Sequence, residues 1–171
     1  SSVANADRIK HVASIIKAYR EQRPVVVLSA MGDTTDYLLE AADMAVKGTV
    51  DVKNVRDLHY ETVETLGLDV KPVDELLGEL NQLLTGISML RELTKKTRDY
   101  LVSFGERLSV RIMAMYLEKE GVPANFFDAW DIGIVSDSNF MAAELLDEVW
   151  ENIPKSLNAY KDGLSNAVPL V

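Results

Sequence analysis

Three hydroxyl side chains, those of Ser29, Thr34 and Thr35, lie close together where an apolar run gives way to a helical pattern. The run Val25–Leu28 has no polar alternation, which is typical of a strand in a buried parallel sheet. Apolar residues then recur at three- and four-residue spacing up to Gly48, which indicates a helix. The hydroxyls therefore stand where the carboxyl end of a strand meets the amino end of a helix, the usual place for a ligand in an open α/β sheet.

Two interpretations of these hydroxyls stay open. Threonine oxygens at a helix start often accept hydrogen bonds from free backbone N–H groups, so Thr34 and Thr35 could be capping residues. The same N–H groups and the positive end of the helix dipole favour an anion, so the segment could instead bind a charged substrate. The P-loop pattern GxxxxGK[ST] is not found at this position, so a nucleotide site of that type is not expected.

A second group of polar residues lies in the stretch SFGERLS, which opens a long helical pattern. Ser103 and Glu106 have the spacing of a capping box, in which both side chains bond backbone N–H groups at a helix start. Gly105 is unusual in a first turn, because glycine costs about 1 kcal/mol relative to alanine in a helix. Its presence suggests that another group approaches the backbone closely. Glu106 would then face a ligand, for which a substrate ammonium group is the natural partner.

The remaining acidic and histidine side chains do not predict a metal site. Asp128 and Asp131 follow a predicted strand and could bind a metal, but solvated acids of a loop are the simpler interpretation. His11 and His59 lie on separate predicted helices, where surface or packing roles are expected rather than a pair of ligands. The chain has no cysteine, which excludes disulfides, thiolate ligands and a cysteine nucleophile.

The elements that must position these residues alternate between helix and strand. Helices are expected at about 5–19 (with Asn5 as N-cap), 34–48, 52–67, 72–87, 94–101, 103–121 and in the second half of 139–153. Strands are expected at 25–28 and 124–127 and from 166 onward. This order favours an α/β protein in which helices cover a largely parallel sheet. With no strand before the first helix and no helix after the last strand, we expect an incomplete domain, because exposed sheet edges are avoided.

Composition excludes several classes of protein. The chain of 171 residues carries a net charge of −9 and no basic run, so binding to nucleic acid is not expected. With 47% hydrophobic and 26% charged residues it resembles an ordinary globular domain. It has no stretch near the roughly 20 apolar residues that a membrane span needs, so no membrane partner is expected. A signal or transit peptide is not visible, although one could precede residue 1.

Several stretches together resemble the aspartate kinases of the amino-acid kinase family. SSVANADRIKHVASII is similar to the segment after the family's Lys-Phe-Gly-Gly phosphate-binding turn. VVVLSAMGDTTDYLLEAA is similar to its second strand, loop and helix. The most specific likeness is LLTGISMLRELTKKTRDYLVSFGERLSVRIMAMYL, which is close to the plant-type enzymes. FFDAWDIGIVSDSNF and NAVPLV follow in the expected order, so the resemblance spans essentially the whole chain.

The resemblance implies part of an amino-acid kinase fold, a three-layer α/β/α sandwich around a largely parallel sheet. Residues 1–171 would be the N-terminal, amino-acid-substrate half of the catalytic domain. The family's catalytic lysine would precede residue 1, and the nucleotide half and regulatory ACT domains would follow Val171. The chain alone is therefore expected to be inactive, with no catalytic residue and no metal ligand of its own.

The implied activity is phosphorylation of the L-aspartate side-chain carboxylate by ATP with Mg²⁺. The product would be 4-phospho-L-aspartate, at the first step of lysine, threonine, methionine and isoleucine biosynthesis. By motif, Ser29 and Thr35, with Thr34 beside them, would belong to the substrate and phosphate side of the site. Glu106 would contact the aspartate ammonium group. The intact enzyme would be a homodimer, in the cytoplasm if bacterial and in the plastid if plant or algal.

Ser1 and Ser2 follow the position of the family's glycine turn, so the resemblance implies that one of them touches the substrate region. Two other functions stay open. Another amino-acid kinase, acting on glutamate, acetylglutamate or a nucleotide, is disfavoured by SFGERLS together with DAWDIG. A non-catalytic metabolite-binding remnant would lack the lysine turn and the nucleotide segment in its full reading frame.

Overall fold

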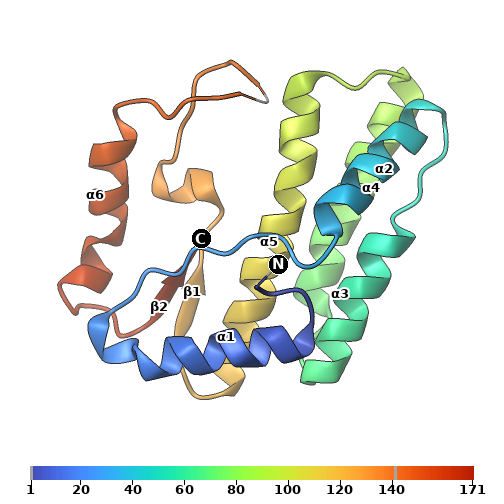
Figure 1. The fold of residues 1–171 in the computed structure, drawn as a ribbon. Helices are drawn as coiled ribbons and strands as arrows, with labels where there is room; N and C mark the ends of the chain where they lie inside the picture. Colours follow the sequence, from blue (N-terminus) through green and yellow to red (C-terminus); the bar gives the residue numbers. More distant parts are fainter. Residues whose placement is uncertain (1, 141) are drawn as a thin grey trace.

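The computed structural model describes residues 2–140 and 142–171, so the predicted role of Ser1 lies outside the described residues. The elements in chain order are α1 (Ala6–Ala18), the 3₁₀ turn η1 (Arg20–Gln22), α2 (Thr34–Val46), α3 (Lys53–Leu66), α4 (Lys71–Leu90), α5 (Lys95–Lys119), β1 (Ala124–Phe126), the 3₁₀ turn η2 (Ala129–Ile132), α6 (Val149–Lys161) and β2 (Val168–Leu170). In Figure 1 the two strands lie between α6, on the left, and α5 with the α2–α3–α4 group on the right. Helix α1 runs along the lower edge.

Local sequence signals set most of the helix boundaries. The Asn5 side chain accepts a hydrogen bond from the Arg8 N–H at 3.0 Å, so the predicted N-cap of α1 is confirmed. Gly67 ends α3 in the left-handed region with φ 61°, where glycine has no Cβ penalty. Pro72 lies in the first turn of α4, where its missing N–H costs nothing. The three predicted boundaries therefore follow from residues next to them in the chain.

Helix α5 begins one residue after Thr94, and the predicted capping box at Ser103 and Glu106 is wrong. The Thr94 side chain accepts from the Thr97 N–H at 3.1 Å, which makes Thr94 the N-cap. Ser103 lies inside the helix, where its hydroxyl donates to the Tyr100 carbonyl at 2.6 Å. The apolar stripe that runs through this region packs into the core. This burial keeps the chain helical through Gly105, despite the low helix propensity of glycine. The buried members of the stripe are Leu101, Phe104, Leu108, Ile112 and Met113.

The sheet is small and parallel, and β2 is its central strand. On one side β2 pairs with β1, with Phe126 opposite Leu170. On the other side the segment 25–28 joins it, because the Val26 N–H donates to the Pro169 carbonyl at 3.0 Å. All of β2 is buried, whereas Val27 in the outer segment is 78% exposed. The prediction that 25–28 is buried on both faces is therefore wrong, since within the described residues one face of this segment is uncovered.

The α/β class with parallel pairing is confirmed, although the described chain is mostly helical. Parallel pairing in the described ranges joins β1 to β2 and Val26 to Leu170, and an isolated antiparallel bridge joins Ser136 to Leu145. The three segments run in the same direction, so their carboxyl ends meet at one edge of the sheet. Ser29 and Asp128 follow two of these ends. None of the described helices has the length and apolarity that crossing a bilayer requires.

His59 gives the core a pH-dependent element. It is fully buried on α3; its Nδ1 donates to the Val55 carbonyl at 2.6 Å, and its Nε2 has no partner among the described residues. Burial lowers the pKa of His59 below its usual 6.5, and the hydrogen bond to Val55 only partly offsets this. Below about pH 6.5 the unfolded chain therefore binds a proton that the folded chain resists.

We expect the free energy of unfolding to fall as the pH drops from about 6.5 towards the lowered pKa of His59, because only the unfolded state takes up the proton. Urea unfolding at pH 7.5, 6.5 and 5.5 would measure this for the unaltered protein and for His59→Leu. The variant should show a flatter pH dependence. Replacing the exposed His11 with glutamine is the matched control and should leave the slope unchanged. Equal slopes in the unaltered protein and the His59 variant would contradict the expectation.

Candidate functional site

Gly105 seats α5 directly on the loop that leads from the 25–28 segment into α2. A Cβ built on Gly105 would lie 2.7 Å from the Ala30 Cβ and 3.5 Å from the Thr34 Cγ2. Only a residue without a side chain permits this approach. The predicted close approach at Gly105 is confirmed, but the groups that approach are Ala30 in the loop and Thr34 at the start of α2.

Three of the predicted site residues adjoin this contact in the chain, near the carboxyl edge of the sheet. Ser29 and Thr35 flank the Ala30–Thr34 segment that Gly105 touches, and Glu106 is the next residue after Gly105 on α5. All three of these side chains are exposed and available to a ligand. Thr34 differs, because it is fully buried and its hydroxyl donates to the Met31 carbonyl at 2.5 Å.

The first turn of α2 is open to an anion. Its N-cap residue, Asp33, makes no side-chain capping hydrogen bond. The Thr34 hydroxyl donates back to Met31 and does not accept from the helix start. Within the described part of the chain the Thr35 hydroxyl has no hydrogen-bond partner either. The geometry therefore does not support a capping role for these threonines. The Thr34 N–H donates to the Met31 carbonyl, which leaves the N–H groups of Thr35 and Asp36 in the first turn for an anion.

The N-terminal segment lies against the same loop. Gly32 has φ 46°, and a Cβ on it would be 3.2 Å from the Ala4 carbonyl oxygen. Val3 is buried, whereas Ser2 is exposed beside it. The arrangement thus places the exposed Ser2 near the loop that precedes α2.

Asp128 forms a buried ion cluster that the sequence did not reveal. Its Oδ2 accepts from Arg107 Nε at 3.0 Å, and its Oδ1 accepts from Arg111 Nη1 at 2.8 Å. Burial by itself raises the pKa of Asp128, but the guanidiniums of Arg111 and Arg107 outweigh it and hold that pKa below its usual range. The interpretation of Asp128 as a solvated acid is wrong. Its exposed neighbour Asp131 instead completes a capping box at η2.

Several groups hold Arg107, although its buried Nη1 has no hydrogen-bond partner among the described residues. Its Nη2 donates to Glu79 Oε2 of α4 at 3.0 Å. Its guanidinium lies 4.6 Å from the Phe104 ring centre and 5.3 Å from the Trp130 ring centre, within cation–π range. The spacing of Arg107 and Arg111, four residues apart on one helix face, was the available signal for this cluster. The described residues contain no group of three or more His, Cys, Asp or Glu side chains that could hold a metal ion.

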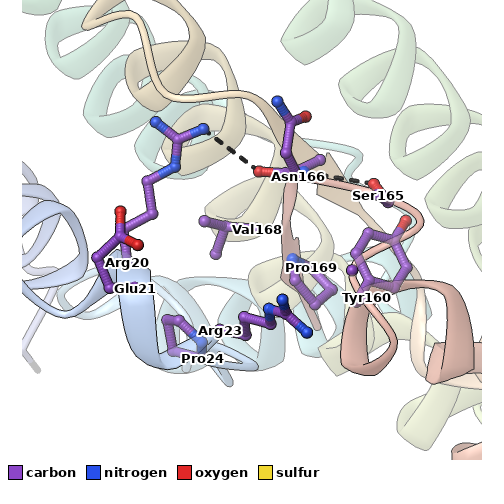
Figure 2. Close-up of a pocket in the computed structure, with 11 residues that line it drawn as sticks. Arg20, Glu21, Arg23, Pro24, Tyr160, Ser165, Asn166, Val168 and Pro169 are labelled. Carbon is purple, nitrogen blue, oxygen red and sulfur yellow. Dashed lines mark hydrogen bonds between the residues drawn. The ribbon is translucent and has the colours of Figure 1, made fainter.

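A polar pocket of about 350 Å³ lies at the opposite, amino edge of the sheet, beside Pro24 and Val168 (Figure 2). Arg20 donates to the Asn166 carbonyl at 3.4 Å, and Arg23 donates to the Lys161 carbonyl at 2.7 Å. These guanidiniums tie η1 and the residue after it to the end of α6 and to the segment that joins α6 to β2. The pocket includes none of the predicted site residues.

Comparison with known proteins matches the chain to one family model and to several relatives. The model of the amino acid kinase family matches residues 1–170. The chain is 42% identical to chloroplastic aspartokinase 2 of Arabidopsis thaliana, with 100% of this chain and 32% of the relative covered. It is 44% identical to chloroplastic aspartokinase 1 of the same plant, covering 100% of this chain and 31% of the relative. The chain therefore spans about a third of the length of these relatives.

Solved structures share the fold. E. coli aspartokinase III, in complex with lysine and aspartate and in complex with aspartate and ADP, matches with a TM-score of 0.79 at 20% identity. Each match covers 99% of this chain and 38% of the other. A likeness at this identity concerns the fold, whereas the family model covers nearly every residue of the sequence. The chain belongs to the amino acid kinase family.

Proposed function

We propose that this chain is the amino-acid-substrate part of an aspartate kinase, which transfers a phosphoryl group from ATP to the side-chain carboxylate of L-aspartate. The product would be 4-phospho-L-aspartate, at the start of lysine, threonine, methionine and isoleucine biosynthesis. The observation that carries the proposal is the close packing of Gly105 on Ala30, which supports a site where the exposed Glu106 would bind positive charge and the first turn of α2 would bind negative charge. Similarity to plant aspartokinases over the whole chain supports the choice of substrate.

Aspartate offers one ammonium group and two carboxylates, and the proposed site provides complementary groups. The exposed Glu106 carboxylate would pair with the ammonium group through a charged hydrogen bond. The Thr35 hydroxyl and the open first turn of α2 would receive negative charge. Ser29, at the carboxyl end of the 25–28 segment, would bind on the same side as the reacting carboxylate.

Phosphoryl transfer requires the protein mainly to position the substrates and to stabilise charge, and little covalent chemistry is needed. Bound ATP and Mg²⁺ would supply the phosphoryl group and neutralise part of its charge. The residues of this chain would orient the attacking carboxylate. The N–H groups of α2 and the Thr35 hydroxyl would stabilise the negative charge that develops between donor and acceptor.

The proposal extends to the rest of the enzyme. Residues 1–171 would form one half of a three-layer α/β/α catalytic domain, and the nucleotide-binding half and ACT domains would lie elsewhere in the polypeptide. The relatives' greater length supports this division. Their chloroplastic names support a plastid location, and we propose a homodimer for the intact enzyme.

The test is an acceptor assay on the complete polypeptide that contains residues 1–171. With ATP, Mg²⁺ and hydroxylamine, an acyl phosphate is trapped as a coloured hydroxamate. We expect hydroxamate with L-aspartate and not with L-glutamate or N-acetylglutamate, because the relatives that match the whole chain are aspartokinases. Hydroxamate formed from glutamate alone would identify another kinase of the family. Binding of aspartate without turnover would identify a metabolite-binding remnant.

A further inference from the structure

We propose that Arg107 is a positioning residue for aspartate binding, which sets the direction of the neighbouring Glu106 carboxylate. This inference rests on the proposed function, because it assigns to Arg107 a role in the ammonium site. Arg107 itself would touch no substrate. It acts by fixing how this turn of α5 is rotated about the helix axis and how closely it packs against the sheet.

The turn of α5 that carries Glu106 is anchored on both flanks. On one flank, Gly105 rests on Ala30 and Thr34, with no side chain of its own to adjust the contact. On the other flank, Arg107 Nε is bound by Asp128, the residue that caps η2 beyond the carboxyl end of β1. Glu106 lies between these anchors, so its Cα–Cβ direction follows from them.

The contacts of Arg107 fix the orientation of its guanidinium as well as neutralise its charge. Three groups from two parts of the chain hold it: Asp128 and the Trp130 ring at η2, and Glu79 on α4. The Arg107 side chain is 9% exposed and that of Asp128 is 8% exposed, so water does not compete strongly for this pair. A planar guanidinium can donate to two carboxylates and stack on a ring at once, whereas an ammonium group cannot.

The variant Arg107→Lys tests whether aspartate binding depends on the shape of the Arg107 guanidinium or only on its positive charge. It keeps the positive charge beside the site but loses the fork that joins Asp128 to Glu79. In the complete enzyme we expect the KM for aspartate to rise about tenfold, while the KM for ATP changes by less than roughly twofold. Arg98→Lys is the matched control, since Arg98 lies on the same helix and pairs with Asp43 at 3.4 Å on the surface. It should change neither constant.

A double-mutant cycle with Glu106→Gln shows whether Arg107 acts through Glu106. In the Glu106→Gln background, Arg107→Lys should change the KM for aspartate by less than roughly twofold, because the carboxylate that it positions is already neutralised. An equal fold-change in both backgrounds would overturn the inference and leave Arg107 as a purely structural residue. If Arg107→Lys does not fold, Glu79→Gln replaces it in the same cycle, since the Glu79 side chain is 54% exposed. An unaltered enzyme without aspartate kinase activity would overturn the proposed function instead.

Discussion

Replacing Glu106 with glutamine should raise the KM for L-aspartate by about 10- to 100-fold in the complete enzyme, because a hydrogen bond to a charged group contributes about 1.5–3 kcal/mol. Glutamine keeps the size of the side chain and removes only the charge that an ammonium group needs. The KM for ATP should stay unchanged, since the nucleotide is proposed to bind outside this chain. Steady-state kinetics with each substrate varied in turn would measure both constants.

The structure makes Glu106→Gln a clean probe. Glu106 is exposed in the middle of α5 and takes no part in a capping box, so its replacement leaves the helix ends intact. Glutamine and glutamate have similar helix propensities, and the free energy of unfolding should change by no more than about 0.5 kcal/mol. Glu21→Gln, an exposed carboxylate at the opposite edge of the sheet, is the matched control. A normal KM for aspartate in Glu106→Gln would refute the ligand role.

The second large effect is expected at Gly105. Alanine there would place a methyl group 2.7 Å from the Ala30 Cβ, which is closer than real Cβ contacts, so α5 and the start of α2 must move apart. Overpacking of this kind costs about 1–3 kcal/mol. Because the same contact seats Glu106 beside α2, the KM for aspartate should rise together with the loss of stability.

Gly78→Ala is the control that measures the effect of helix propensity without a packing clash. Gly78 lies inside α4 with nothing within 4 Å of a built Cβ, so alanine there should stabilise the protein by up to about 1 kcal/mol. The propensity gain is common to both sites. Gly105→Ala should therefore be about 1–3 kcal/mol less stable than Gly78→Ala in denaturant unfolding. Equal free energies of unfolding for the two variants would show that α5 is not seated tightly on Ala30.

Local signals predicted the helices well where the relevant partners are near in the chain. Asn5, Gly67 and Pro72 act within a turn of their own helix, and the amphipathic stripe of α4 is buried as its spacing predicts. The capping box predicted from local sequence at Ser103 and Glu106 was wrong. A capping-box pattern describes what a helix start would need, but it does not say that a helix starts there, and the buried stripe of α5 continues through it.

The sequence by itself was enough to identify the family motifs and to predict most helix positions. It also predicted the parallel class of the sheet and a close approach at Gly105. Only the tertiary structure decided which group approaches Gly105, which strand is central and how Asp128 is paired. Arg107 and Asp128 are 21 residues apart, and their ion pair exists only because α5 packs against the carboxyl end of β1. Val27 is exposed because no described element covers that face of the 25–28 segment. Such pairings depend on long-range packing, which residue types and spacings within one segment do not encode.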